Sequence, residues 1–108
     1  YLTKIWTNLI SNSIKYRKNT EPLIIELGVK DDGGDMLKFY IKDNGIGIEE
    51  KDFDFIFKLF SRTRTKEVEG TGVGLPIVKK IINKHGGDIW VSSEVGKGST
   101  FYFSIPKY

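Results

Sequence analysis

The sequence contains no cysteine and a single histidine, His85, among its 108 residues. Disulfide bonds and thiolate metal sites are therefore excluded, and a histidine-rich metal centre cannot form. No apolar run approaches the roughly 20 residues of a membrane-spanning helix, and no signal-peptide pattern is present. The net charge is only +3, and no basic stripe interleaved with aromatic residues suggests nucleic acid. We therefore expect a globular domain that contacts neither nucleic acid nor a membrane directly.

The chain is long enough for one domain with a real hydrophobic core. Its hydrophobic fraction is 39% and its charged fraction 29%, as in ordinary globular proteins. The first residue is Tyr1, and the sequence begins inside a helical pattern. We expect residues 1–108 to be a single domain excised from a longer chain.

The spacing of apolar residues predicts a two-layer fold. One helix is expected from the start of the chain to about Arg17, a short second helix within 49–60, and a third from Gly72 to the pair Gly86-Gly87, with Pro76 in its first turn. Alternating segments predict strands over 23–29, 36–42, 89–93 and 100–105, joined as two hairpins. Residues 61–69 have no period and are predicted to form a loop. This order predicts an α/β (α+β) sandwich, with a mixed, mainly antiparallel sheet and helices on one face.

Two glycine-rich segments have different flanks. The first, 43–48, reads Asp-Asn-Gly-Ile-Gly-Ile, and the second, 70–75, reads Gly-Thr-Gly-Val-Gly-Leu. The second leads into a helix, whose N-terminus attracts anions such as phosphate. The first carries a carboxylate, which can accept a hydrogen bond from the exocyclic amine of a base. A hairpin turn at the first segment and a flexible hinge at the second are the alternatives.

Asn8, Asn12 and Lys15 share one face of the first helix, at the rim of its apolar stripe. Asparagine disfavours helix interiors, so two at this spacing indicate a function. Amide oxygens suit Mg²⁺ and a lysine suits phosphate, although a solvated polar face is the alternative. Arg62, in the charged loop before Gly70, is a candidate to stabilise phosphoryl charge. His85 is expected to be a partly buried residue near a helix C-terminus rather than a catalytic one.

Taken together, these segments resemble the catalytic ATP-binding domain of sensor histidine kinases, which has the Bergerat fold and belongs to a superfamily with gyrase and heat-shock chaperone ATPases. The resemblance covers nearly the whole chain. The matching segments are 8–16 (N box), 43–48 (G1 box), 53–60 (F box), 70–75 (G2 box) and 96–101 (the final Gly-Ser/Thr element).

The resemblance implies a role for each matching residue. Asn12 would coordinate Mg²⁺, while Asn8 and Lys15 would contact phosphate. Tyr16 would pack against adenine, and Asp43 would accept from its amino group. The rest of the implied nucleotide site comprises Gly45, Gly47 and Ile48, then Gly70, Thr71, Gly72, Val73, Gly74 and Leu75, and finally Thr100 beside the adenine. Residues 61–70 would form a lid over ATP, with Arg62 at the γ-phosphate.

The resemblance also implies the reaction: transfer of the γ-phosphoryl group of ATP to a histidine on a separate dimerisation domain of the parent chain, leaving ADP. A response regulator receiver domain would act downstream, in the cytoplasm, whether or not the parent is anchored in a membrane. Gyrase-like members place a water-activating glutamate four residues before the metal-binding asparagine, where this chain has Asn8. An amide is a poor general base, which favours a kinase over a hydrolase. A serine kinase of the anti-sigma type and a nucleotide-binding module without transfer activity stay open as alternatives.

Overall fold

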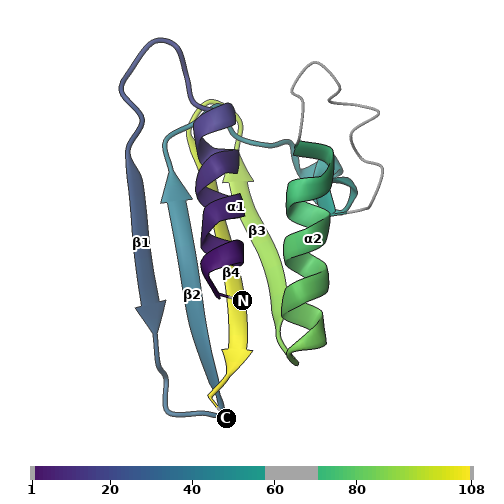
Figure 1. The fold of residues 1–108 in the computed structure, drawn as a ribbon. Coiled ribbons are helices and arrows are strands. Elements are labelled where there is room, and N and C mark those ends of the chain that lie inside the picture. Colours follow the sequence, from purple (N-terminus) through teal and green to yellow (C-terminus); the bar gives the residue numbers. More distant parts are fainter. Residues whose placement is uncertain (1, 58–70, 108) are drawn as a thin grey trace.

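The computed structural model describes residues 2–57 and 71–107. Its elements, in chain order, are α1 (Leu2–Lys15), β1 (Ile25–Lys30), β2 (Met36–Asp43), the 3-10 turns η1 (Glu50–Asp52) and η2 (Phe55–Phe57), α2 (Thr71–Lys84), β3 (Asp88–Glu94) and β4 (Gly98–Pro106). The strands form one sheet in the order β1-β2-β4-β3, and α1 and α2 cover one of its faces (Figure 1). The predicted two-layer sandwich is confirmed, and each strand pairing in this sheet is antiparallel.

Both predicted hairpins are present, and glycines with positive φ turn them. Gly33, at φ +91°, lies in the turn between β1 and β2. Gly96 and Gly98, at φ +88° and +128°, turn the chain from β3 into β4. Side chains rarely adopt this region of backbone space, whereas glycine enters it readily. The turn chemistry therefore helps to fix the register within each hairpin, between β1 and β2 and between β3 and β4.

The hydrophobic core lies between the helices and the sheet. α1 and α2 place their apolar stripes against the inward residues of the central strands, as the helical spacing predicts. Phe103 is the centre of this packing: its ring stacks on Phe39 at 5.0 Å and meets Trp6 edge-on at 5.2 Å. The buried hydrophobic residues are Ile5, Leu9, Ile41, Leu75, Val78, Ile82, Ile89, Phe101, Phe103 and Ile105.

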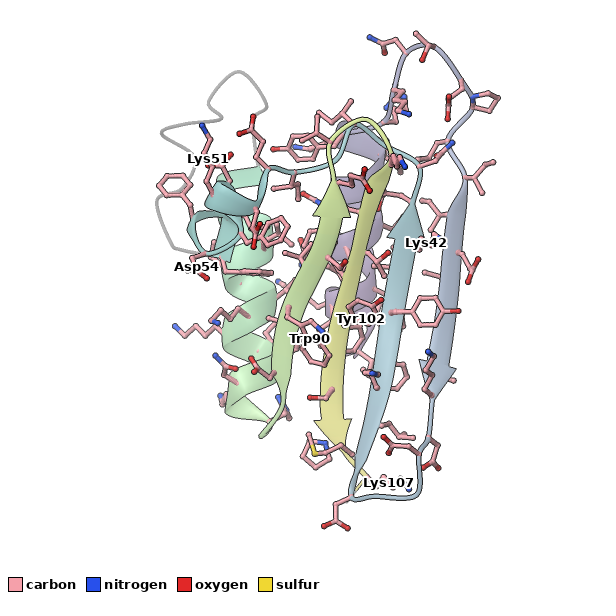
Figure 2. All side chains as sticks on the ribbon, turned by 180° about the vertical axis from the view of Figure 1, so that it is seen from behind. Lys42, Lys51, Asp54, Trp90, Tyr102 and Lys107 are labelled. Atoms are coloured by element: carbon pink, nitrogen blue, oxygen red, sulfur yellow. The ribbon has the colours of Figure 1, made fainter. Side chains whose placement is uncertain are left out.

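The opposite face of the sheet, which α1 and α2 do not cover, carries a row of aromatic side chains (Figure 2). Trp90, Tyr102 and Tyr40 are cross-strand neighbours, and the rings of Trp90 and Tyr102 stack at 5.6 Å. The Tyr40 ring continues the row over Gly28, where a Cβ would overlap it, and its hydroxyl donates to Glu26 at 2.8 Å. Such cross-strand pairs stabilise an exposed sheet face.

Three local predictions are wrong. Where a short helix was predicted within 49–60, η1 and η2 form two separate 3-10 turns, and residues 58–60 lie outside the described residues. Asp52 N donates to the Glu49 carbonyl at 2.9 Å, and Phe57 N to that of Asp54 at 3.4 Å. Aspartate and phenylalanine are modest helix formers, and packing of Phe57 against the core overrides their helical spacing.

The other two errors concern α2. The helix begins at Thr71, so Pro76 is its sixth residue and lies beyond the first turn, where it removes one intrahelical hydrogen bond. His85 is exposed rather than partly buried, because the helix ends just before it. Its Nδ1 lies 2.8 Å from the Ile81 carbonyl, so the ring covers the end of the helix instead of the core.

Candidate functional site

Four segments distant in sequence meet at one end of the sandwich (Figure 1). The C-terminal end of α1, the end of β2, the β3–β4 hairpin and the N-terminal end of α2 all lie there. Strand β2 delivers Asp43 to this end, while α1 delivers Asn12, Ser13 and Lys15. The site is therefore built on regular elements, which hold side chains more firmly than loops do.

Asp43 is a buried carboxylate, 8% exposed, with three hydrogen-bond donors. Ser13 Oγ donates to its Oδ2 at 2.8 Å. The backbone N–H groups of Gly45 and Ser99 both donate to its Oδ1, at 2.9 and 3.3 Å. Asp43 forms no ion pair with the cations that the structure describes, so these donors are what offsets its desolvation.

The segment 44–48 after Asp43 is fixed to two neighbours by its backbone. Ile46 N donates to the Tyr16 carbonyl at 3.0 Å, and Gly96 N donates to the Ile46 carbonyl at 2.8 Å. Gly45 has no room for a side chain, since a Cβ there would lie 2.6 Å from the Tyr16 carbonyl oxygen. The glycines expected to shape a pocket thus let this segment lie against α1 and the β3–β4 hairpin.

The hydroxyls of Ser93 and Ser99 connect segment 44–48 to the β3–β4 hairpin by hydrogen bonds. Ile48 N donates to Ser93 Oγ at 2.8 Å, and Ser93 Oγ donates to the Gly98 carbonyl at 2.8 Å. Since that uses the only proton of Ser93, the 2.8 Å contact between the Ser93 and Ser99 hydroxyls is donated by Ser99. These hydrogen bonds connect Ile48 to Ser99, the residue that pairs with Asp43 in the sheet.

Asn44 stabilises the approach to β1 rather than facing the site. Its Oδ1 accepts from Ile24 N at 2.8 Å, and its Nδ2 donates to Glu21 Oε1 and the Pro22 carbonyl, both at 3.0 Å. The Asn44 side chain thus forms three hydrogen bonds within the protein. These bonds give Asn44 a structural role.

The polar face of α1 lies on the other side of the site from β2. Asn12 is 7% exposed, and its side chain forms no hydrogen bond within residues 2–57 and 71–107. The Asn8 amide donates to the Lys4 carbonyl at 2.9 Å, one turn earlier in the helix. Lys15, the last residue of α1, is exposed. Because no fully buried side-chain nitrogen or oxygen among the described residues lacks a hydrogen-bond partner, the Asn12 amide still reaches solvent and has capacity left for a ligand.

The N-terminal end of α2 lies close to the polar face of α1. A Cβ built on Gly74 would lie 3.7 Å from Asn8 Oδ1, so the two helices approach closely there. Thr71–Leu75, expected partly as a loop, belong to the first turns of α2, and Leu75 is a buried core residue. The first N–H groups of a helix have no intrahelical partner, so this end suits an anion. Arg62 and Gly70, and with them the predicted lid over 61–70, lie outside the described residues.

Thr100 does not lie where it was expected. It pairs with Lys42 and Ser92, and therefore points to the outer face of the sheet with Tyr102. Ser99, which pairs with Asp43, faces the site instead. Residues alternate between faces along a strand, so an error of one position moves the side chain across the sheet.

Sequence reasoning also missed Ser13. Ile5, Leu9 and Ser13 recur every four residues on the buried stripe of α1. A serine on such a stripe needs a buried hydrogen-bond partner, and that signal was available.

Clustered acidic and histidine ligands do not occur in the described part of the chain: no group of three or more His, Cys, Asp or Glu side chains is placed to hold a metal. A cation at this site would depend on amide oxygen and on ligands from a bound molecule. Neither α1 nor α2 is long and apolar enough to cross a bilayer, nor is any other helix within the described ranges.

Solved structures of histidine kinases share this architecture. The catalytic domain of histidine kinase ThkA superimposes with a TM-score of 0.81 at 32% identity, covering 98% of this chain and 67% of that one. Full-length ShkA in complex with AMPPNP superimposes with a TM-score of 0.82 at 30% identity, covering 97% of this chain and 21% of that one.

Sequence comparison gives the family. Residues 1–108 match the model of the histidine kinase-, DNA gyrase B- and HSP90-like ATPases, and the chain belongs to this family. Cyanobacterial phytochrome B from Nostoc sp. is 49% identical over 104 residues, which cover 94% of this chain. The chain spans only 14% of the length of that relative. The resemblance drawn from the sequence motifs is confirmed.

Proposed function

We propose that this domain binds ATP with Mg²⁺ and provides its γ-phosphoryl group for transfer to a histidine on a dimerisation domain of the parent protein. The observation that carries the proposal is the buried Asp43 carboxylate, which three donors hold beside the polar face of α1. Family membership and the AMPPNP complex of the similar ShkA structure support ATP as the nucleotide.

Asp43 would select the base. A carboxylate held by donors from α1, segment 44–48 and β4 has a fixed orientation, and its remaining acceptor capacity suits the amino group of adenine. Tyr16, whose carbonyl holds Ile46, would pack against the base, and Gly45, Gly47 and Ile48 would shape its pocket. In place of Thr100, Ser99 would support this pocket through its backbone N–H, which donates to Asp43 Oδ1 and is kept when the side chain is changed.

The residues present fit Mg²⁺ at the phosphates. Asn12 is 7% exposed, and its amide forms no hydrogen bond to a described residue while not being fully enclosed, so its oxygen is available as a neutral ligand. Bound there, the ion would neutralise charge on the phosphate oxygens. Asn8, Lys15 and the N-terminal end of α2, from Thr71 to Leu75, would hold the phosphates, with Arg62 and Gly70 contributing from the lid.

The chemistry would consist of positioning and charge stabilisation. The acceptor imidazole supplies the nucleophile: a nitrogen–phosphorus bond forms, the bond to the β-phosphate oxygen breaks, and ADP leaves. Lys15 and Arg62 would take up charge during transfer. We infer that a receiver domain then takes the phosphoryl group, that the reaction is cytoplasmic, and that neither nucleic acid nor a membrane contacts this domain.

The test combines nucleotide binding with transfer. Asp43→Asn should weaken ATP binding by about tenfold or more, because the exchanged amide presents a donor toward another donor. Asn12→Ala should abolish labelling of an added acceptor domain by γ-labelled ATP while the domain stays folded. Asn83→Ala, an exposed asparagine at the other end of α2, is the matched control. Full labelling by the Asn12 variant would refute the metal assignment, and unchanged affinity in the Asp43 variant would refute the adenine assignment.

A further inference from the structure

Ser13 is the most deeply buried polar side chain that touches the site. It is 1% exposed and lies on the apolar stripe of α1, four residues after Leu9. Its hydroxyl crosses 30 residues of sequence to donate to Asp43 Oδ2 at 2.8 Å. A buried hydroxyl on an apolar stripe needs a hydrogen-bond partner, and the carboxylate of Asp43 is the partner that it has.

The donors to Asp43 are divided unequally between its two oxygens. Oδ1 accepts from two backbone N–H groups, those of Gly45 and Ser99. Among residues 2–57 and 71–107, Oδ2 accepts only from Ser13. A carboxylate oxygen accepts about two hydrogen bonds, so Oδ1 is saturated and Oδ2 retains one accepting direction.

We propose that Ser13 is a positioning residue for nucleotide selection: its hydroxyl fixes Asp43 Oδ2 so that the remaining accepting direction meets the exocyclic amine of the base. The inference rests on the proposed function, since it assumes that Asp43 binds adenine. Ser13 itself touches no base. It acts by preventing rotation of the carboxylate about its Cβ–Cγ bond, which the two donors on Oδ1 restrain from one side only.

This role predicts a loss that depends on the amine. Without the Ser13 hydroxyl, Oδ2 becomes an unpaired buried acceptor that rotates or recruits water, and the base amine must compete with both. A purine nucleotide without the amine never makes that contact, so its affinity does not depend on Ser13. A merely structural role would weaken both nucleotides equally.

The experiment compares Ser13→Ala with Ser99→Ala in this domain. Alanine is the best helix former, so the first variant keeps α1, and thermal unfolding verifies its fold. Ser99→Ala is the matched control: it removes another buried hydroxyl of the site, but the Ser99 backbone N–H still donates to Asp43. Calorimetry gives the Kd of ATP and of purine riboside triphosphate, which lacks the amine, for each variant.

We expect Ser13→Ala to weaken ATP by about three- to tenfold and purine riboside triphosphate by less than twofold. Ser99→Ala should change the two nucleotides by the same factor. Equal losses for both nucleotides in Ser13→Ala, or no loss for ATP, would overturn the inference. Asp43→Asn distinguishes failure of the Ser13 inference from failure of the proposed function. If Asp43→Asn weakens ATP binding while Ser13→Ala does not, only the positioning role of Ser13 is refuted. If Asp43→Asn leaves ATP binding unchanged, the assignment of Asp43 to adenine is itself refuted.

Discussion

Gly47 lies directly against the backbone of Glu94. Its φ is +82°, and a Cβ at this position would overlap the Glu94 carbonyl oxygen. The neighbouring residue, Ile46, accepts from Gly96 N at 2.8 Å. Segment 44–48, which follows Asp43, is therefore held on the β3–β4 hairpin by a contact that only glycine permits.

Gly47→Ala should displace this segment. Both the left-handed backbone and the collision with backbone atoms oppose a side chain, so we expect a loss of about 2 kcal/mol or more in the free energy of unfolding, together with weaker ATP binding. Gly33→Ala is the control, because Gly33 has a similar φ of +91° but open space around it. It should cost only about 1 kcal/mol and leave ATP affinity unchanged. Equal effects of the two substitutions in urea unfolding would show that the Glu94 contact does not matter.

Phe103→Ala should destabilise the domain more than any surface substitution. The ring is fully buried and contacts Phe39 and Trp6, so its removal leaves a cavity between α1 and the sheet. We expect a loss of about 3–5 kcal/mol, measured by urea unfolding. Val95→Ala, at a side chain that is 60% exposed, should change stability by less than about 0.5 kcal/mol. A Phe103 variant as stable as the Val95 variant would contradict this packing.

The turn between β1 and β2 should contribute a pH-dependent term to stability. Lys107 Nζ contacts Asp31 Oδ1 at 2.7 Å, and Gly33 N donates to the same oxygen at 3.0 Å. The Lys107 contact, and then the Gly33 hydrogen bond, lower the pKa of Asp31 below its usual 3.8. A lowered pKa in the folded state means that the stabilisation is present above pH 3.8 and is lost as the pH falls through the folded-state value.

Asp31→Asn should therefore be less stable than the unmodified chain at pH 7, and the difference should vanish as the pH is lowered below 3.8. Thermal unfolding at a series of pH values measures it. Asp32→Asn removes the same charge from the same turn without affecting the Lys107 contact, and serves as the control. A stability difference that stays constant down to pH 2 would contradict the ionic origin of the term.

The sequence predicted the elements well because their periodicity reports burial directly. The stripe of α1 and the alternation of Phe39 and Ile41 in β2 both face the core as expected. Predictions about single site residues were less reliable, because they depend on contacts distant in sequence. Whether Ser99 or Thr100 faces Asp43 is decided by the register of β4 against β2, which a list of motifs does not contain.

The short helix predicted within 49–60 was wrong over residues 49–57 for a related reason. Its phenylalanines are at helical spacing, but Ile56 and Phe57 contact the core through two short 3-10 turns. Tertiary packing overrides local propensity in so short a segment. The same holds for His85, whose place on the apolar stripe suggested burial although α2 ends one residue earlier.

Asn8→Glu should shift the domain from phosphoryl transfer toward ATP hydrolysis. Asn8 lies one turn before Asn12 on α1 and close to Gly74 at the start of α2, so its side chain borders the proposed phosphate site. Its amide donates to the Lys4 carbonyl and is a poor general base, whereas a carboxylate there would accept a proton from an attacking water. We expect steady-state ATP turnover to rise by about tenfold, which is less than general-base catalysis usually gives, because the surrounding residues do not orient the new carboxylate.

Asn8→Gln is the control: glutamine has the same side-chain length as glutamate but cannot act as a general base, so ATP turnover should stay at the original level. Equal turnover of the glutamate and glutamine variants, measured by ADP release without an acceptor domain, would show that position 8 does not decide between water and histidine as the acceptor.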